Sequence, residues 1–285
     1  MFSILTINAA LQDVRLFARS LYRPLNHIDK RLQELAIQIR DNNPDLVCIQ
    51  ELFHADYQHQ FFSLLQTTYP YATGFASPGF KLRLGNELII LSKYPLGEGQ
   101  LHRFRQATFE ERLFTSKGVY SIKVEIPDIG KIQVMNFHMT AGGLRQHPEH
   151  PVMESIRSNQ IKQLLMTLNP EMPVILAGDL NAGTDVSTKN YNQILKEGFI
   201  DAFVESGGSG ITWDPGNPLV ANHGENHLPP QRIDHIFLNS VAAEILEPDK
   251  GEVVFNKPCI HINETHSIPV SDHYGIRIDF NLNKT

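Results

Sequence analysis

The stretch Pro173-Val174-Ile175-Leu176-Ala177-Gly178-Asp179-Leu180-Asn181 is the most informative part of the sequence for the fold. A short apolar run bounded by proline and glycine is typical of a buried β-strand. The run leads directly into two side chains that carry oxygen, those of Asp179 and Asn181. A single acid or amide after a strand is most often a turn residue, so the pattern matters only if it recurs.

The pattern does recur along the whole chain, with an apolar strand followed by an acid, an amide or an imidazole. The other polar residues at strand ends are Asn8, Glu51, the pair Asn136 and His138, the pair Asp234 and His235, and the pair Asp272 and His273. Since a sheet brings its strand ends together along one rim, we expect a cluster rich in oxygen ligands with histidines beside it. Such a cluster suits Mg²⁺ or Mn²⁺, and the spacings typical of zinc sites are absent.

The remaining pattern predicts a mixed α and β domain with two sheets and outer helices. Apolar residues recur at helical spacing from Ile28, and Asn42-Asn43-Pro44 ends that helix. Further helices are expected over Asp56 to Thr67 and Glu154 to Leu168. Strands are expected over Ser3 to Asn8, Asp45 to Gln50, Tyr71 to Ala76, Glu87 to Ser92, Val119 to Ile126, Lys131 to Asn136, Pro173 to Ala177, Arg232 to Leu238 and Tyr274 to Phe280. No composition break divides the chain, so residues 1–285 are interpreted as one domain.

Composition excludes several classes of protein. The 285 residues are 41% hydrophobic with a formal net charge of −6, which is ordinary for a globular chain. No run approaches the ~20 apolar residues of a membrane-spanning helix, and no targeting segment is recognised at the N-terminus, which leaves the compartment open. The acidic balance argues mildly against binding of duplex DNA through its phosphates alone. It does not exclude a phosphate substrate, because a divalent metal supplies local positive charge.

A set of motifs in a fixed order resembles the endonuclease/exonuclease/phosphatase superfamily over residues 3–280. They are Asn8, Gln50-Glu51, Leu91-Ser92-Lys93-Tyr94-Pro95, Asn136-Phe137-His138, Gly178-Asp179-Leu180-Asn181, Arg232-Ile233-Asp234-His235-Ile236-Phe237 and Ser271-Asp272-His273. The resemblance implies an α+β fold, a four-layer αββα sandwich of two packed, mostly antiparallel sheets flanked by helices. It also implies an active site at one end of the sandwich, where the strand ends are expected to meet.

Within that superfamily the sequence resembles the neutral sphingomyelinase branch. The features are Ser116-Lys117-Gly118-Val119, Asn136-Phe137-His138, Arg157-Ser158-Asn159-Gln160 and Thr212-Trp213-Asp214-Pro215. The segment from Met139 to Gly143 departs from that branch, and no membrane-docking hairpin is clear. Phe104, Phe109, Leu113 and Phe114 are candidates for an interfacial patch, although burial in the core is favoured. The implied partner is a phospholipid at a membrane surface.

The chemistry that fits is hydrolysis of a phosphodiester by a metal-positioned water. Glu51 would be the principal Mg²⁺ ligand, supported by Asn8 and Asp272, and no organic cofactor is expected. His273 would act as general base and Asp234 would orient it. Asp179 and Asn181 would position the nucleophile and a phosphoryl oxygen. His138 would bind the phosphate or protonate the leaving group.

Other functions remain open on the same residues. A metal-dependent nuclease, similar to DNases or AP endonucleases, is the main alternative. A phosphoinositide phosphatase is less favoured, because Gln231-Arg232-Ile233-Asp234 replaces the usual Pro-x-Trp-Cys-Asp-Arg signature. A non-catalytic module is disfavoured since no ligand position is lost. Lys93 and Lys117 are either phosphate contacts or solvated surface residues. His235 is interpreted as structural, because neighbouring residues of a strand face opposite sides.

Overall fold

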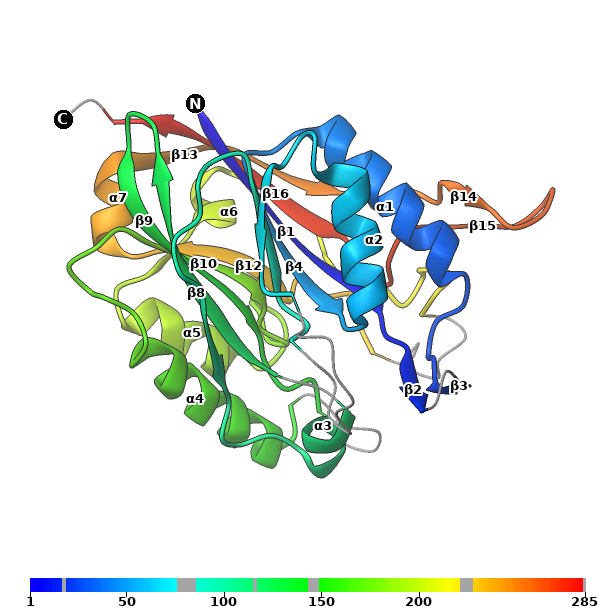
Figure 1. Ribbon diagram of the computed structural model, residues 1–285. Helices are drawn as coiled ribbons and strands as arrows, with labels where there is room; N and C mark the ends of the chain where they lie inside the picture. Colours follow the sequence, from blue (N-terminus) through cyan, green and yellow to red (C-terminus); the bar gives the residue numbers. More distant parts are fainter. Residues whose placement is uncertain (17–18, 76–85, 115–116, 143–148, 221–227, 284–285) are drawn as a thin grey trace.

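Two six-stranded sheets pack face to face, and helices cover their outer faces (Figure 1). The computed structural model describes residues 1–16, 19–75, 86–114, 117–142, 149–220 and 228–283. The first sheet has the order β13 (Leu246–Val254), β16 (Gly275–Leu282), β1 (Phe2–Leu11), β4 (Leu46–Leu52), β6 (Ile89–Ser92), β5 (Tyr71–Thr73). The second has the order β11 (Ile200–Asp201), β12 (Asp234–Leu238), β10 (Val174–Asp179), β9 (Gly130–His138), β8 (Gly118–Ile126), β7 (Gln100–Arg103). The αββα sandwich expected from the sequence is therefore confirmed.

The central strands of the first sheet, β1, β4 and β6, are buried on both faces, which explains their mostly apolar sequences. β1 and β4 run parallel, while the other pairings in this sheet are antiparallel. Side chains alternate, so that Leu5 packs with the outer helices and Ile4 lies between the two sheets. The helices on this face are α1 (Ile28–Asn42) and α2 (Ala55–Leu65). α1 ends where expected, because Asn43 takes a left-handed conformation just before Pro44.

The second sheet has the same construction around its own parallel pair, β9 and β10. Helices α4 (Pro151–Leu165) and α5 (Thr188–Lys196) cover its outer face. α4 begins one turn earlier than the expected Glu154, since His150 caps it and Pro151 opens the first turn. Gly178 lets β10 approach β9 closely: a Cβ atom there would lie 2.0 Å from the carbonyl oxygen of Phe137.

A buried amide network joins the two sheets just below one end of the sandwich. The Gln50 side chain donates to Asn136 Oδ1 at 2.7 Å. The Asn136 amide in turn donates to the carbonyl oxygens of Ile49 and Ile89, both at 2.9 Å. Asn136 is therefore inside β9 rather than in a turn, and it fixes the spacing of the sheets where their strands end.

The smaller elements and three of the four edge strands of the two large sheets were not expected from the sequence. They comprise β2 (Val14–Leu16), β3 (Arg19–Tyr22), α3 (Phe109–Phe114), α6 (Ala202–Glu205), α7 (Ser240–Ile245), β14 (Ile260–His261) and β15 (Ser267–Ile268), together with β7, β11, β13 and helix α5. The strand expected over Tyr71 to Ala76 ends at Thr73, and Ala76 lies outside the described residues. No helix in the described ranges has the length and apolar character needed to cross a membrane.

The aromatic residues near α3 divide between core and surface. Phe104 is buried, as favoured from the sequence, whereas Phe109 is 73% exposed, so its assignment to the core is wrong. The side chains of Leu113 and Phe114 lie outside the described residues. Cys48 is buried between the sheets, where its small thiol packs among apolar side chains.

Candidate active site

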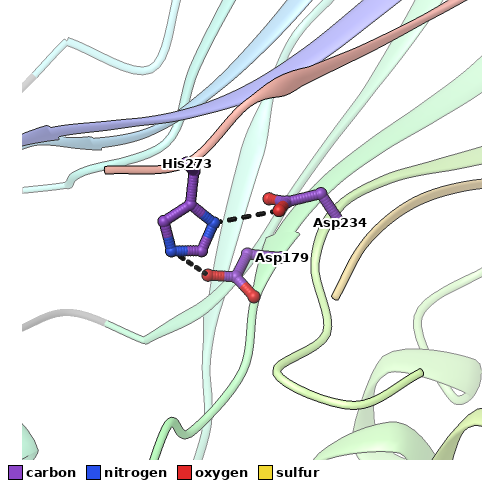
Figure 2. Close-up of side chains that lie close together, drawn as sticks. All are labelled: Asp179, Asp234 and His273. Atoms are coloured by element: carbon purple, nitrogen blue, oxygen red, sulfur yellow. Dashed lines mark hydrogen bonds and ion pairs between the residues drawn. The ribbon is translucent and has the colours of Figure 1, made fainter. Parts of the chain in front are cut away.

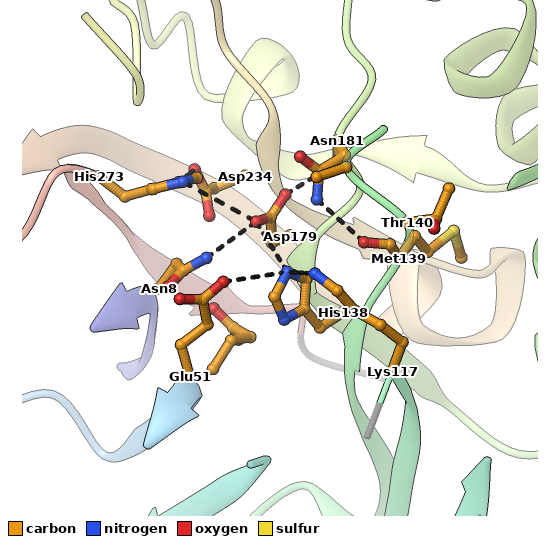
Figure 3. A network of polar contacts seen from close by, with 12 residues as sticks. Asn8, Glu51, Lys117, His138, Met139, Thr140, Asp179, Asn181, Asp234 and His273 are labelled. Carbon is orange, nitrogen blue, oxygen red and sulfur yellow. Dashed lines mark hydrogen bonds and ion pairs between the residues drawn. The ribbon is translucent and has the colours of Figure 1, made fainter. Parts of the chain in front are cut away.

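Six of the polar residues expected at strand ends meet at one end of the sandwich (Figure 3). The first sheet contributes Asn8 from β1, Glu51 from β4 and His273 from just before β16, and the second contributes His138, Asp179 and Asp234 from β9, β10 and β12. All except Glu51 are at most 7% exposed. The adjacent strands β1 and β4 end at this rim on one side, and β9 and β10 on the other. Residues far apart in sequence are therefore brought together by the strand order alone.

Asp179 is the centre of the polar network. Its Oδ2 accepts a hydrogen bond from the Asn8 amide at 3.0 Å and lies 3.3 Å from His138 Nε2. Its Oδ1 accepts from the backbone N–H of Asn181 at 2.9 Å. Burial raises the pKa of Asp179, but the hydrogen bond and the charge of His138 outweigh burial and hold the pKa well below its usual range. The contact with His138 thus holds Asp179 in its ionised form.

Asn181 sits at the turn after β10, where its φ of 52° is left-handed. Its amide donates to the carbonyl oxygen of Met139 at 3.0 Å. This contact ties the turn after β10 to the segment after β9, so that Asn181 borders the cluster (Figure 3).

His273 lies between two carboxylates (Figure 2). Its Nδ1 is 2.9 Å from Asp234 Oδ2, and its Nε2 is 4.0 Å from Asp179 Oδ2. Burial lowers the pKa of His273, but the Asp234 carboxylate outweighs burial and the pKa stands well above its ordinary value. The side-chain donor atoms of this trio lie within 4.8 Å of one another. The second oxygen of Asp234, Oδ1, is buried and has no hydrogen-bond partner among the described residues.

His138 lies between the Glu51 side and the Asp179 side of the cluster. Its Nε2 contacts Lys117 Nζ and lies 3.6 Å from Glu51 Oε1, while its Nδ1 is 2.9 Å from Glu87 Oε1. Burial raises the pKa of Glu51, against the opposing effects of His138 and Lys117. Sequence reasoning treated Glu87 only as the start of a strand. The signal that could have marked it is an acid placed directly before a buried apolar run.

Asp272 lies at the border of this cluster. Its side chain is partly exposed and accepts a hydrogen bond from Ser271 Oγ at 3.3 Å. Its charge raises the pKa values of both Glu51 and the buried Arg31, which places Asp272 on the Glu51 side of the site. Burial is the larger influence on both groups, raising the pKa of Glu51 and lowering that of Arg31. Within the described residues, no hydrogen bond joins Asp272 to Glu51 or to Asn8.

Two other residues considered from the sequence lie away from the cluster. His235 faces the opposite side of β12 from Asp234, where its Nε2 is 2.8 Å from the carbonyl oxygen of Ala182 and its Nδ1 is 2.8 Å from Arg232. The structural interpretation of His235 is therefore confirmed. Lys93 binds Asp45 and the carbonyl oxygen of Asn43, at the opposite end of β4 from Glu51.

Trp213 is buried in a small cluster with Val186, Val220 and Ile233. Its backbone forms bridges with Gln231 and with His273. The tryptophan segment thus helps to hold the backbone that carries His273, and its ring packs with apolar neighbours.

The sequence and the fold were compared with known proteins. The model of the endonuclease/exonuclease/phosphatase family matches residues 5–273. Sphingomyelinase C of Listeria ivanovii is 22% identical over 245 residues, and the match covers 80% of this chain and 71% of that protein. Sphingomyelinase C of Leptospira interrogans is 22% identical over 227 residues, which covers 74% of this chain but only 40% of that protein.

Several solved structures share the fold. Sphingomyelinase C from Streptomyces griseocarneus has a TM-score of 0.76 at 18% identity, covering 97% of this chain and 98% of that chain. A double mutant of beta toxin from Staphylococcus aureus with bound magnesium ions has a TM-score of 0.75 at 22% identity, covering 97% and 98%. TDP2 of D. rerio, complexed with a single-strand DNA product, has a TM-score of 0.69 at 21% identity and covers 98% of both chains.

Proposed function

The chain belongs to the endonuclease/exonuclease/phosphatase family, and on that premise we propose that it is a metal-dependent phosphodiesterase acting on a phospholipid of the sphingomyelin type. One observation carries the proposal of hydrolysis: an imidazole, His273, is held against a buried carboxylate at the rim where the other polar residues gather. The lipid substrate is supported by the two sphingomyelinase C relatives, which match most of this chain.

The charges at the rim fit a divalent cation. The amide nitrogen of Asn8 donates to Asp179, while its oxygen accepts from the Ala10 backbone N–H at 3.1 Å. Glu51, Asp179, Asp234 and Asp272 bring carboxylate oxygens to one region. Oxygen donors of this kind are those that Mg²⁺ and Mn²⁺ prefer. Burial raises the pKa of Glu51, and a cation bound beside it would lower that pKa. A phosphodiester anion would be repelled by such a site unless a cation were also present.

We assign the cation to Glu51, with Asn8 and Asp272 in support. These residues would hold the ion, which would supply positive charge to the phosphoryl oxygens and the leaving oxygen. The trio of Asp179, Asp234 and His273 has its donor atoms close enough for a metal. However, His273 Nδ1 is already committed to Asp234. This hydrogen bond favours a role for the trio in proton transfer over a role in binding the metal.

His273 is proposed as the general base. A carboxylate only accepts hydrogen bonds, so Asp234 requires the proton of neutral His273 to be on Nδ1. Nε2 then carries the lone pair that takes a proton from the attacking water. Asp179 and Asn181 are proposed to position that water and a phosphoryl oxygen. His138 is proposed to donate a proton to the leaving oxygen from Nε2.

A nuclease is the second candidate, favoured by the shared fold with a protein solved in complex with single-stranded DNA. The test is a panel of phosphodiesters: vesicles containing sphingomyelin, vesicles of phosphatidylcholine, and single-stranded DNA, each with Mg²⁺ and with EDTA. We expect release of phosphocholine from sphingomyelin that EDTA abolishes and H273A removes. The control that retains activity is E154Q. It removes the charge of Glu154 on α4, whose carboxylate pairs with Lys189 of α5. Cleavage of DNA alone would establish the nuclease instead.

A further inference from the structure

We infer that Arg31 is a positioning residue for the proposed metal site: its buried guanidinium fixes the backbone that follows Asn8 and the backbone that precedes Asp272. The inference rests on the proposed function, because these two residues are proposed to support Glu51 in holding the cation. Among the described residues, Arg31 makes no hydrogen bond to a side chain of the site. It acts through the two backbone segments.

Arg31 interrupts the apolar face of α1, one of the helices that cover the first sheet (Figure 1). Within the described ranges, Arg31 is 0% exposed and no carboxylate forms a salt bridge with it. A buried charge without an ion-pair partner is costly, whereas an apolar side chain would complete the stripe that packs on the sheet. The other buried residues of α1 are Ile28, Leu32, Leu35, Ala36 and Ile39. Packing alone therefore does not account for an arginine at this position.

In the described part of the chain, the guanidinium donates only to backbone carbonyl oxygens at the rim. Nε donates to Val270 O at 2.9 Å. Nη2 donates to Ala9 O at 2.7 Å, and both Nη1 and Nη2 donate to Ala10 O at 3.1 Å. The planar fork of an arginine allows one side chain to reach these three acceptors at once. Arg31 thus joins the end of β1 to the segment that precedes β16.

These two segments carry the supporting residues of the proposed metal site. Asn8 comes directly before the two alanines that Arg31 contacts, and Asp272 comes two residues after Val270. A second contact holds the same segments together, because Ser271 Oγ donates to the carbonyl oxygen of Asn8 at 2.6 Å. The position of Asn8 relative to Asp272 therefore depends on Arg31 and on Ser271.

Arg31 also holds the residue that orients the Asn8 amide. Ala10 has a left-handed φ of 49°, which is uncommon for a residue with a side chain. Its N–H donates to Asn8 Oδ1 at 3.1 Å, while its carbonyl oxygen accepts from Arg31. The Asn8 amide nitrogen donates in turn to Asp179 Oδ2 at 3.0 Å. An amide oxygen has two lone pairs, so the oxygen of Asn8 keeps one for a cation.

The charge of Arg31 has an effect on the metal site that differs from its hydrogen bonds. Burial lowers the pKa of Arg31 to about 10, although Asp272 and Glu51 raise it. The side chain therefore stays protonated at neutral pH. A fixed positive charge near these two carboxylates opposes the approach of Mg²⁺. Charge and positioning thus change the affinity for Mg²⁺ in opposite directions, and a substitution that keeps the charge separates the two.

Arg157 is the matching side chain of the second sheet. It is 0% exposed on α4 and donates to the carbonyl oxygens of Thr140 at 3.1 Å and Ala141 at 3.4 Å. These carbonyls lie just after the end of β9, beyond His138. An outer helix on each face of the sandwich thus directs one buried arginine to the end of a strand. Arg157 provides a control with the same chemistry as Arg31, on the His138 side of the site.

Mg²⁺ binding to the metal-free protein, measured by isothermal titration calorimetry, tests the inference without any substrate. R31K keeps the charge, but a single ammonium group does not hold three carbonyl oxygens in the same geometry. We expect R31K to bind Mg²⁺ about 10–100-fold more weakly than the wild type, as for other groups that orient metal ligands. R31M should also bind Mg²⁺ more weakly. R157K should keep its affinity for Mg²⁺ within about threefold of the wild type.

Two outcomes would overturn the inference. If Arg31 acts only through its charge, R31M binds Mg²⁺ more tightly than the wild type and R31K binds it equally well. If Arg31 is only a packing residue, both variants lose thermal stability but bind Mg²⁺ with unchanged affinity when folded. Should neither variant fold, S271A tests the link between the same two segments. S271A should weaken Mg²⁺ binding, and unchanged binding in folded S271A would then refute the inference.

The same titration separates this inference from the proposed function. A wild type that binds no Mg²⁺ would overturn the metal assignment and the role of Arg31 with it. Weaker Mg²⁺ binding in R31K, together with turnover of DNA alone, would support the positioning role and overturn only the lipid substrate. In the active protein, R31K should need more Mg²⁺ for half-maximal turnover, while kcat at saturating Mg²⁺ changes less than about threefold. R157K should lower kcat without changing the dependence on Mg²⁺.

Discussion

Asp234→Asn is the substitution that tests the proposed general base most directly. Asp234 is fully buried, and its Oδ2 lies 2.9 Å from His273 Nδ1. Asparagine has nearly the same shape, so it removes the charge with little change in packing. At a pH above the raised pKa of His273, where the ring is neutral, the attraction between Asp234 and a protonated His273 develops only when His273 takes the proton from water. Its loss therefore raises the barrier and leaves the ground state largely unchanged.

The size of the effect follows from the distance. Two unit charges 2.9 Å apart attract by about 6 kcal/mol at an effective dielectric constant of ~20. The asparagine oxygen can still accept a hydrogen bond and keeps part of this energy. We expect a net loss of about 4 kcal/mol, which corresponds to a fall in kcat of about 10³-fold. Burial lowers the pKa of His273, and the Asp234 carboxylate raises that pKa by more than burial lowers it. Without this carboxylate the pKa of His273 should fall. The acid limb of the pH–activity profile of D234N should therefore move to lower pH.

The assay is steady-state turnover, with and without Mg²⁺, of whichever phosphodiester the wild type cleaves. D185N is the control, because it removes an exposed carboxylate from the loop that follows Asn181. Circular dichroism and thermal unfolding establish that each variant is folded. A folded D234N with kcat within threefold of the wild type would falsify the assignment of His273 and Asp234 as base and orienting acid.

Three further predictions concern the metal, the dependence of stability on pH and the packing of the sheets. E51Q should lower turnover at least 10²-fold and weaken Mg²⁺ binding in isothermal titration, and unchanged binding would remove Glu51 from the metal site. Burial lowers the pKa of His138, but Glu87 and Asp179 outweigh it and raise the pKa to about 9. The stability from His138 is therefore complete below its unfolded pKa of ~6.5 and lost as the pH rises through 9. The urea midpoint of metal-free protein should fall as the pH rises over this window, and it should fall less in H138Q. An equal fall in the two proteins would contradict the raised pKa of His138. Gly178→Ala should cost about 1–3 kcal/mol or more in chemical unfolding, because its Cβ would meet Phe137 O at 2.0 Å, and an unchanged midpoint would refute this.

The sequence was informative where a strand is buried on both faces. The runs ending at Asn8 and Asp179 are mostly apolar because sheet and helix cover both of their sides. The edge strands β7, β11 and β13 were missed for the opposite reason. β13 pairs on one side only, and it includes Pro248 and a register shift before Lys250, so its sequence reads as a polar loop.

The contact of Glu87 with His138 was not predicted because it depends on the second sheet. In sequence, Glu87 is only an acid at the start of an apolar run. Its partner His138 lies on β9, and the pairing exists only because the sheets stack with β6 and β9 facing each other at the rim. Local patterns describe single strands well, but contacts between sheets depend on the spacing between layers, which no single stretch of sequence encodes.

Alternation along the strands explains which polar residues reach the site. Three site residues lie an even number of positions along their own strand from side chains that are buried between the sheets. They are Asp179, Asp234 and His138, and all three face the cluster. His235 has the opposite parity and faces the outer helices. Glu51 also has the outward parity, yet it faces the cluster, because its φ of 59° breaks the alternation at the end of β4. A left-handed conformation at a residue other than glycine costs about 1 kcal/mol or more. The strained backbone therefore lies at the end of β4. A regular strand conformation there would point Glu51, the proposed metal ligand, away from the site.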